Sequence, residues 1–474
     1  MGKKITIEPV TRIEGHGRVT IHLDDQGAVE QTFFHVDEFR GLEKFCEGRP
    51  YHEMPQITQR ICGICPVSHH LAAAKACDSI EGVEIPRPAK LLRELLHMGQ
   101  MVQSHGLHFF HLASPDLLLG FDADPAIRNV VGIVQANPEL ALKAINLRRY
   151  GQQIIERLGG KRIHPNFTVP GGVNAPLSPK NRDEIGAELK TMTGIVLEGI
   201  GIIKGWLEAN RDFAADFASF PSGYMGLITP EGGLELYDGD IRLKDAKGNL
   251  LAQFRPDHYL AHVAEHVEPW SFLKFPFYRK RGWPNGFYRV GPLARMNIVD
   301  KMGTPRADEE LKYWRSLNGG RPVEGSLYYH YARMAEALYC LERIDALLDD
   351  PDILSRDVRA YPSAKFPGGG VGVIEAPRGT LFHDYSVDEN GQLTRVNLIV
   401  ATGNNNWAMN IAAGQVAKAH VKGNHLTEGM LNRVEAAIRC YDPCLSCATH
   451  AIGKMPLEVI LYAADGTVLD RVGR

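Results

Sequence analysis

Cysteine is scarce in this sequence, and long apolar runs are missing from it. Its 8 cysteines among 474 residues are too few for a small scaffold held together by disulfides, so we expect thiols that stay reduced. The most apolar stretch, residues 191–206, is interrupted by Glu198 and Lys204 and is shorter than the roughly 20 residues that a membrane helix needs. We also expect no secretory signal, because no apolar segment follows the first lysines. These features predict a cytoplasmic protein without a membrane segment.

An excess of charge of either sign is missing too. The chain carries 53 Lys and Arg against 56 Asp and Glu, a formal net charge of −3, and no basic run stands out. Proteins that bind nucleic acids usually show a basic patch or stripe, so we expect no nucleic-acid partner. A hydrophobic content of 44% is ordinary for a globular chain, and this length can bury a large core.

The spacing of apolar residues predicts a mixed architecture. Alternation over residues 4–34 predicts a small antiparallel sheet. Helical spacing is found over residues 57–78, 88–113, 126–158 with a break at Pro138, 180–218 and 325–350. Further strands are expected over residues 224–256, 371–376, 380–386, 394–401 and, as a terminal hairpin, 457–472. Because no linker or repeat divides the chain, we predict one interwoven α+β unit, a large helical core with small antiparallel sheets.

Two C-x-x-C motifs lie near opposite ends of the chain. They are Cys62-Gly-Ile-Cys65 and Cys444-Leu-Ser-Cys447. Together they could supply four thiolates to zinc, to an iron–sulfur cluster or to nickel. Zinc ribbons usually separate their pairs by only about 15–20 residues, so a four-sulfur site here would have to be assembled by the whole fold. Two unrelated turns are the alternative.

Five motifs, in this order, resemble those of nickel–iron hydrogenase large subunits. They are Thr11-Arg-Ile-Glu-Gly-His16, Phe39-Arg-Gly-Leu-Glu43, Arg60-Ile-Cys-Gly-Ile-Cys65 with His69, Glu375-Ala-Pro-Arg-Gly379, and Asp442-Pro-Cys444 through His450. The resemblance runs from about residue 5 to the C-terminus. The sequences of residues 290–297 and 444–450 are most similar to those of the cytoplasmic, bidirectional, NAD-reducing type. The resemblance implies the fold of that family and reversible heterolytic cleavage of H2.

By this resemblance, the motif cysteines would hold a Ni-Fe(CO)(CN)2 centre. Cys62 and Cys444 would be terminal nickel ligands, whereas Cys65 and Cys447 would bridge nickel and iron. Soft thiolates suit both metals. Heterolytic cleavage of H2 needs a Lewis acid and a nearby base, and the sulfur of Cys444 is the candidate for that base. The carboxylate of Glu14 would pass the proton outward.

The resemblance also assigns residues around the metals. Arg378, which follows Pro377, would hydrogen-bond cyanide and face the open side of the centre, although a buried structural ion pair is the alternative. Asp442 and Asp116 match acidic residues that hold this arginine. Thr402 matches a hydroxyl that donates to the other cyanide, although its neighbours depart from the usual family sequence.

A second metal and one histidine complete the implied set. Glu43, a main-chain carbonyl near Leu398, and His450 resemble the ligands of a structural Mg²⁺. His69 would place its ring against a cluster sulfur, with an ordinary core histidine as the alternative. The glycine-rich residues 368–372 lack the spacing of a nucleotide-binding loop, so we do not expect this chain to bind NAD.

Residues 451–474 follow the last motif histidine. In the family, an endopeptidase removes such a tail after nickel insertion, so we predict a single catalytic unit of residues 1–450 and a cleaved extension of residues 451–474. We expect the tail to keep the C-terminal cysteine pair away from its mature position until the metals are loaded. The family also implies diaphorase subunits, with flavin and iron–sulfur clusters, and an iron–sulfur small subunit.

Three other functions stay open at this point. A hydrogen-sensing relative would share the site, but such proteins generally lack the C-terminal tail. A metal-free relative, like the homologous subunit of respiratory complex I, has lost the thiols that this chain retains. A four-cysteine zinc interaction module would contain zinc in place of nickel and iron, so elemental analysis separates it from the hydrogenase.

Overall fold

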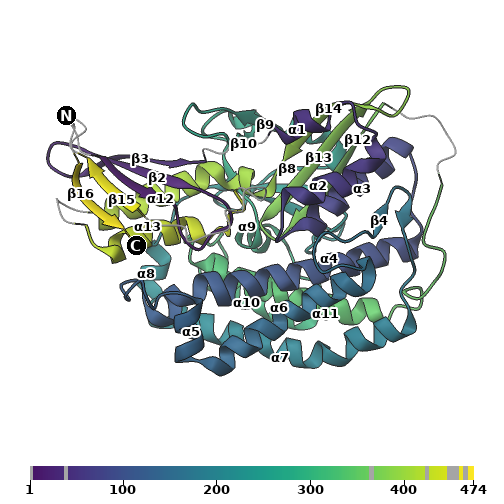
Figure 1. Cartoon of the computed structure of the whole chain (residues 1–474), viewed down its shortest axis with the longest axis horizontal. Helices are drawn as coiled ribbons and strands as arrows, with labels where there is room; N and C mark the ends of the chain where they lie inside the picture. Colours follow the sequence, from purple (N-terminus) through teal and green to yellow (C-terminus); the bar gives the residue numbers. More distant parts are fainter. Residues whose placement is uncertain are drawn as a thin grey trace.

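The computed structural model describes residues 4–36, 41–361, 368–421, 426–445, 458–462 and 468–473. Long helices run side by side along one flank of the elongated molecule, and small sheets occupy the opposite flank (Figure 1). This arrangement confirms the predicted fold class, a helical core with small antiparallel sheets. The predicted division into a catalytic unit and a cleaved tail stays a prediction.

Four helices form the main bundle. They are α4 (Arg87–Leu107), α6 (Pro138–Gly159), α7 (Pro179–Ala209) and α11 (Tyr328–Leu348). Helix α4 packs between α6 and α11, and α7 packs on α11. The chain continues from α4 into two π-helical segments, His108–Ala113 and Pro115–Leu119. The buried apolar faces of these helices account for the helical spacing found in the sequence.

Two of the predicted helices are interrupted. Pro138 is the first residue of α6, so the predicted helix over 126–158 consists of α5 (Val130–Ala136) and α6. The region 57–78 consists of α2 (Met54–Thr58), the 3₁₀ turn Gln59–Ile61 and α3 (Pro66–Glu81), with the first C-x-x-C motif before α3. A proline fits the first turn of a helix because its missing N–H has no partner there.

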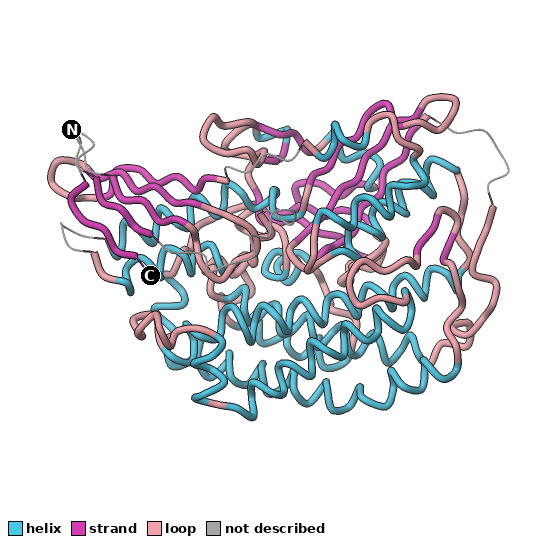
Figure 2. The backbone as a smooth tube through the Cα atoms, viewed as in Figure 1, coloured by secondary structure: helices cyan, strands magenta, loops and turns pink. Residues whose placement is uncertain are grey.

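A five-stranded antiparallel sheet joins the two ends of the chain. Its strand order is β16-β15-β1-β2-β3. In Figure 2 it is the group of magenta strands at the left of the molecule. Its strands are β1 (Lys4–Glu8), β2 (Arg18–Leu23), β3 (Val29–His35), β15 (Glu458–Tyr462) and β16 (Val468–Gly473). Lys4 pairs with Tyr462, and Glu8 pairs with Glu458. The predicted N-terminal sheet and C-terminal hairpin are therefore confirmed as parts of one sheet.

A second antiparallel sheet packs against α3. It contains β12 (Gly369–Ala376), β13 (Gly379–Val387) and β14 (Leu393–Ile399). A Cβ atom on Gly372 would lie only 2.0 Å from the carbonyl oxygen of Ala72 in α3. The glycine-rich residues therefore form a strand that lets the helix approach its backbone closely. This contact brings the start of α3 beside the turn between β12 and β13.

The remaining elements surround these layers. Strands β6 (Gly223–Ile228), β7 (Asp240–Lys244) and β8 (Leu250–Phe254) confirm the hairpin region at 224–256, and β11 (Tyr288–Arg289) joins them in parallel. Smaller pairs are β4 (Thr168–Val169) with β5 (Gly172–Val173) and β9 (Val263–His266) with β10 (Phe275–Tyr278). Further helices are α1 (Leu42–Cys46), α8 (Arg211–Asp216), α9 (Pro292–Ile298), α10 (Pro305–Ser316), α12 (Asn406–His420) and α13 (Glu428–Arg439). Within the described ranges, every helix is too short or too polar to cross a bilayer.

Candidate metal centre

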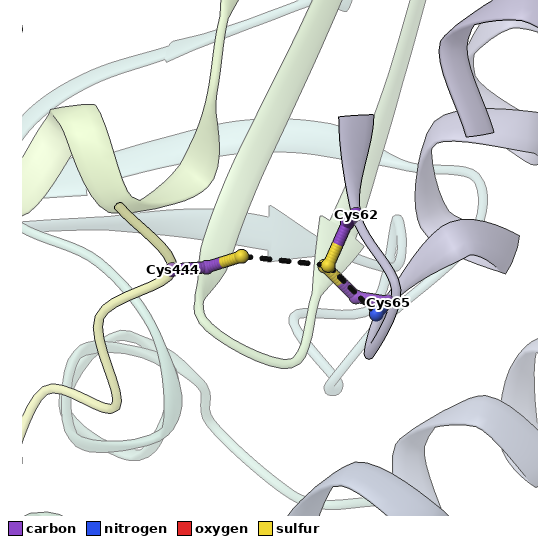
Figure 3. Close-up of side chains that lie close together, drawn as sticks. All are labelled: Cys62, Cys65 and Cys444. Carbon is purple, nitrogen blue, oxygen red and sulfur yellow. Dashed lines mark hydrogen bonds between the residues drawn. The ribbon is translucent and has the colours of Figure 1, made fainter. Parts of the chain in front are cut away.

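Three of the four motif cysteines meet in the interior. Cys62 and Cys65 flank the turn that precedes α3, and Cys444 lies on the segment that follows α13. Cys62 Sγ is 2.7 Å from Cys65 Sγ and 3.4 Å from Cys444 Sγ (Figure 3). All three sulfur atoms are buried and lie within 4.8 Å of one another, so a single metal ion could contact all of them. Cys447 lies outside the described residues.

The surroundings of the sulfur atoms favour negative charge on part of the cluster. The backbone N–H groups of Ile64 and Cys65 donate to Cys62 Sγ at 3.3 and 2.9 Å. Burial raises the pKa of the Cys62 thiol, whereas its hydrogen bond with Cys65 lowers the pKa of Cys65. The positive charge of Arg378 acts to lower both pKa values. The pair therefore loses its first proton more readily than its second.

Arg378 lies at the tip of the hairpin between β12 and β13. Its Nε donates to the carbonyl oxygen of Asp442 at 2.6 Å, and its Nη2 donates to Asp442 Oδ1 at 3.1 Å. Burial opposes its charge, but Asp442 and the two thiols hold the pKa of Arg378 above its ordinary value. Within the described part of the chain, the buried atoms Arg378 Nη1 and Asp442 Oδ2 have no hydrogen-bond partner. The predicted pair with Asp442 is present, and one donor is left over.

A cavity of about 320 Å³ opens beside this donor. Its wall includes Cys65, Cys444, Ser68, His69, Arg378 and Thr402. The hydroxyl oxygen of Thr402 accepts the backbone N–H of Cys444 at 3.0 Å, which leaves the hydroxyl hydrogen free to donate. Buried donors without partners are rare in proteins, and they fit a bound group that carries acceptors such as cyanide. The residues present therefore fit a thiolate-bound Ni-Fe(CO)(CN)2 group.

Glu14 lies directly beside the C-terminal motif. Its backbone forms an isolated parallel bridge with Cys444. Glu14 N–H donates to the carbonyl of Pro443 at 3.3 Å, and Leu445 N–H donates to the carbonyl of Glu14 at 3.0 Å. Glu14 is 6% exposed. The structure thus brings the predicted proton carrier next to the predicted first base.

Asp116 does not hold Arg378, and the expected contact is wrong. Its Oδ1 accepts from Arg12 Nη2 at 2.5 Å and from Asn432 Nδ2 at 2.9 Å, and its Oδ2 accepts from Arg439 Nη1 at 2.6 Å. Burial opposes its ionisation, but the neighbouring Arg439 and Arg12 lower the pKa of Asp116. Both carboxylate oxygens are therefore engaged by Arg12 of the N-terminal segment and by two residues of α13.

His69 lines the cavity, and Pro377 stands in the chain between the lining residues Ala376 and Arg378. His69 Nδ1 lies 3.1 Å from Nε2 of the buried His383, and its predicted contact with a cluster sulfur stays a prediction. The carbonyl of Pro377 accepts from Arg295 Nη2 at 3.4 Å, so Pro377 connects the hairpin tip to the core beneath it.

The predicted magnesium ligands are partly brought together. Glu43 Oε1 accepts the backbone N–H of Leu398 at 2.8 Å, and Lys274 Nζ lies 3.8 Å from the same oxygen. Lys274 also pairs with Glu265 at 3.2 Å. His450 lies outside the described residues. Glu43 and Leu398 are therefore neighbours, while the magnesium site itself stays a prediction.

Several residues at the centre escaped the sequence reasoning. Ser68 lies between the motif residues Cys65 and His69, and its buried hydroxyl has no partner among the described residues. Arg12 lies within the first motif, and Arg439 lies three residues before Asp442. Helical spacing could have found Ser68, because residues three and four apart share one face. The ion pairs of Arg12 and Arg439 join residues that are far apart in the chain, so no local sequence pattern indicates them.

A cluster of buried cysteine sulfur atoms, a guanidinium with a spare donor and a cavity that adjoins both are the features of a sulfur-bound metal centre. The family model described as nickel-dependent hydrogenase matches residues 40–126 and 225–450, and a HoxL-like model matches residues 4–39. The chain therefore belongs to the nickel-dependent hydrogenase large subunits.

Individual relatives extend over the whole chain. The NAD-reducing hydrogenase HoxS subunit beta of Cupriavidus necator is 42% identical over 100% of both chains. A chain of the F420-non-reducing hydrogenase vhu of Methanococcus voltae is 46% identical over 89% of this chain and 100% of its own length. The crystal structure of an NAD+-reducing [NiFe]-hydrogenase in the H2-reduced state superimposes with a TM-score of 0.91 at 46% identity, covering 94% of this chain and 99% of the other.

Proposed function

We propose that this hydrogenase chain cleaves H2 reversibly and delivers its electrons to NAD or NADP through partner subunits. The observation that carries the proposal is the cluster of Cys62, Cys65 and Cys444, of which Cys65 and Cys444 line one cavity together with Arg378 and its spare Nη1 donor. The resemblance to an NAD-reducing relative and to an NAD+-reducing hydrogenase structure supports the acceptor.

Cys62, Cys65, Cys444 and Cys447 would hold the nickel–iron group in this proposal. When bound, this group supplies the Lewis acid that polarises H2 toward heterolytic cleavage. Arg378 and Thr402 orient it by donating to its cyanide ligands, and Asp442 holds Arg378 in place. The Cys444 sulfur accepts the proton, and Glu14, whose backbone pairs with Cys444, carries it outward.

The structural magnesium and the cleaved tail are further parts of the proposal. Glu43, the segment at Leu398 and His450 would hold Mg²⁺. Strand β15 of the tail pairs with β1, yet Cys444 already lies 3.4 Å from Cys62 with the tail attached. The effect of the tail on the C-terminal cysteine pair stays a prediction. An endopeptidase would remove residues 451–474 after metal insertion.

The expected partners follow from the electron path. We propose an iron–sulfur small subunit that accepts electrons and diaphorase subunits, with flavin and further iron–sulfur clusters, that reduce NAD or NADP in the cytoplasm. Relatives named as F420-non-reducing hydrogenases favour a second assignment, with the same H2 chemistry and a different acceptor. Reduction of NAD+ or NADP+ by the purified complex under H2 would select the first assignment, and reduction of an artificial dye alone would select the second.

Metal analysis with infrared spectroscopy tests the centre itself. The purified complex should contain about one nickel and, beyond its iron–sulfur clusters, one iron per chain, with absorption bands in the carbon monoxide and cyanide stretch region. Zinc without these bands would overturn the proposal and leave a zinc interaction module. Intact bands with H2 binding but negligible turnover would indicate a hydrogen sensor.

A further inference from the structure

Buried ionic contacts hold the segment that carries Glu14. The N–H of Thr11 donates to Glu435 Oε1 at 2.7 Å, and the carbonyl of Thr11 accepts from Arg439 Nη2 at 2.9 Å. Glu435 and Arg439 both belong to α13, the helix that leads into the C-terminal motif. The chain just before Glu14 is therefore hydrogen-bonded to α13, the helix just before Cys444.

Arg12 also connects the segment that carries Glu14 to the π-helical segments after α4. Its Nη1 donates to the carbonyl of Leu112 at 2.9 Å, and its Nη2 donates to Asp116 at 2.5 Å and to Asn432 at 2.9 Å. Asp116 lies on the π-helical segment Pro115–Leu119, a distortion often found at functional sites. Because Asp116 also binds Arg439, its single carboxylate joins both arginines.

The backbone shows why these contacts matter. Arg12 has a φ of 56°, in the left-handed region that residues other than glycine rarely adopt. Such a conformation persists only where surrounding contacts impose it. Arg12 precedes Glu14 by two residues, so relaxation at Arg12 would move the Glu14 carboxylate relative to Cys444.

We propose that Asp116 is a positioning residue for proton transfer. Through its ion pairs with Arg12 and Arg439, Asp116 fixes the position of the Glu14 carboxylate relative to Cys444. This inference rests on the proposed function, in which Glu14 carries the proton. Its role differs from that of Arg378, because Asp116 contacts the N-terminal segment and α13. Proton transfer is steep in distance, and a displacement of about 1 Å can lower a rate by about 100-fold.

Asp116→Asn tests the proposal in the assembled, metal-loaded complex. The amide keeps the shape of the side chain and removes its charge. We expect a 10- to 100-fold slower exchange of H2 with D2O and an increased solvent isotope effect, with unchanged nickel content and unchanged carbon monoxide and cyanide bands. Asp122→Asn is the matched control, because exposed Asp122 pairs with Arg433 of the same α13 at 2.6 Å. The control should change the exchange rate less than twofold.

A second set of variants separates this inference from the proposed function. Arg12→Lys keeps the charge but loses the planar fork of donors, so it should also slow the exchange. This variant replaces Asp116→Asn as the test if Asp116→Asn fails to fold. Glu14→Gln should slow exchange at least as much as Asp116→Asn does, and adding Asp116→Asn to it should slow exchange no further. Full exchange in Glu14→Gln would overturn the proposed proton path. Slow exchange in Glu14→Gln with normal exchange in Asp116→Asn and Arg12→Lys would overturn only the positioning role.

Discussion

The protein buries two arginine clusters that differ in how completely their polar atoms are paired. Arg295 donates to both oxygens of Glu336 at 2.5 and 2.6 Å and to Glu375 at 2.6 Å. The second oxygen of Glu375 accepts from the hydroxyl of Thr380 at 2.7 Å. Every nitrogen of Arg295 and every oxygen of its two glutamates has a partner.

The cluster around Arg378 is left incomplete. Arg378 Nη1 and Asp442 Oδ2 are buried without a partner in the described part of the chain, and a cavity adjoins them. A saturated buried network stabilises and rigidifies a core, whereas an unsaturated one beside a cavity is suited to bind something. The comparison separates a structural arginine from a binding arginine although both are buried.

The largest effect is expected from the sulfur ligands. Cys65→Ser should abolish nickel loading and H2 oxidation, because a hydroxyl is a poor ligand for soft metals. Cys340→Ala, at a buried thiol within α11, should keep both properties. Metal analysis and H2 oxidation by the purified complex measure the difference. Normal nickel content in Cys65→Ser would contradict the proposed ligand set.

Arg378→Lys should impair function far more than stability. Loss of one aligned donor at a reaction centre typically lowers a rate by about 100- to 1,000-fold. The cyanide bands should also shift, while the unfolding free energy of the metal-free chain should change by less than about 2 kcal/mol. Normal bands and normal turnover in Arg378→Lys would show that Arg378, like Arg295, has only a structural role.

Glu336→Gln should show the opposite pattern. It breaks the saturated pair with Arg295, and loss of one partner of a buried ion pair costs about 3–5 kcal/mol. Denaturant unfolding of the metal-free chain measures this loss, and the folded fraction should retain its activity per nickel. A cost below about 1 kcal/mol would break the comparison between the two clusters.

Stability should fall as the pH drops from about 7 to 5. Burial lowers the pKa of His97 and of His105 to about 4, so the folded chain keeps both neutral. Unfolded histidine has a pKa of about 6.5, so the unfolded state binds protons first and gains roughly 2 kcal/mol per histidine over this range. Unfolding at several pH values measures the slope, and His105→Gln should reduce it. The neighbour Glu336 stays ionised over this range because its pKa is lowered to about 2, and Arg333 and Arg295 stay charged as arginines do in proteins.

The smallest effect is expected at Thr402. Thr402→Val keeps the shape but removes the acceptor of the Cys444 N–H and the spare hydroxyl donor. A neutral hydrogen bond contributes about 1 kcal/mol, so activity should fall roughly fivefold. A shift of one cyanide band would show that the hydroxyl donates to the bound group, and unchanged bands would restrict Thr402 to supporting Cys444.

Local sequence patterns predicted much of the fold. Period-2 and helical spacing located the terminal sheet, the bundle helices and the hairpin at 224–256. Helices α12 and α13 were not predicted. Helix α12 is rich in small residues and buried over most of its length, so its apolar residues give little one-sided spacing. The predicted strand over 371–376 missed Gly369 and Gly370 of β12, because the function of Gly370, close approach to α3, depends on a partner element.

The sequence by itself determined the ligand types, because C-x-x-C spacing and the turn at Pro377 and Arg378 place these side chains through a few local bonds. It also singled out Glu14, which the structure places beside Cys444. Only the tertiary structure decided which charges pair: Asp116 binds Arg12 and Arg439, although sequence reasoning joined it to Arg378. Ion pairs depend on distances between elements far apart in the chain. Those distances follow from the packing of helices and sheets, which no local pattern records.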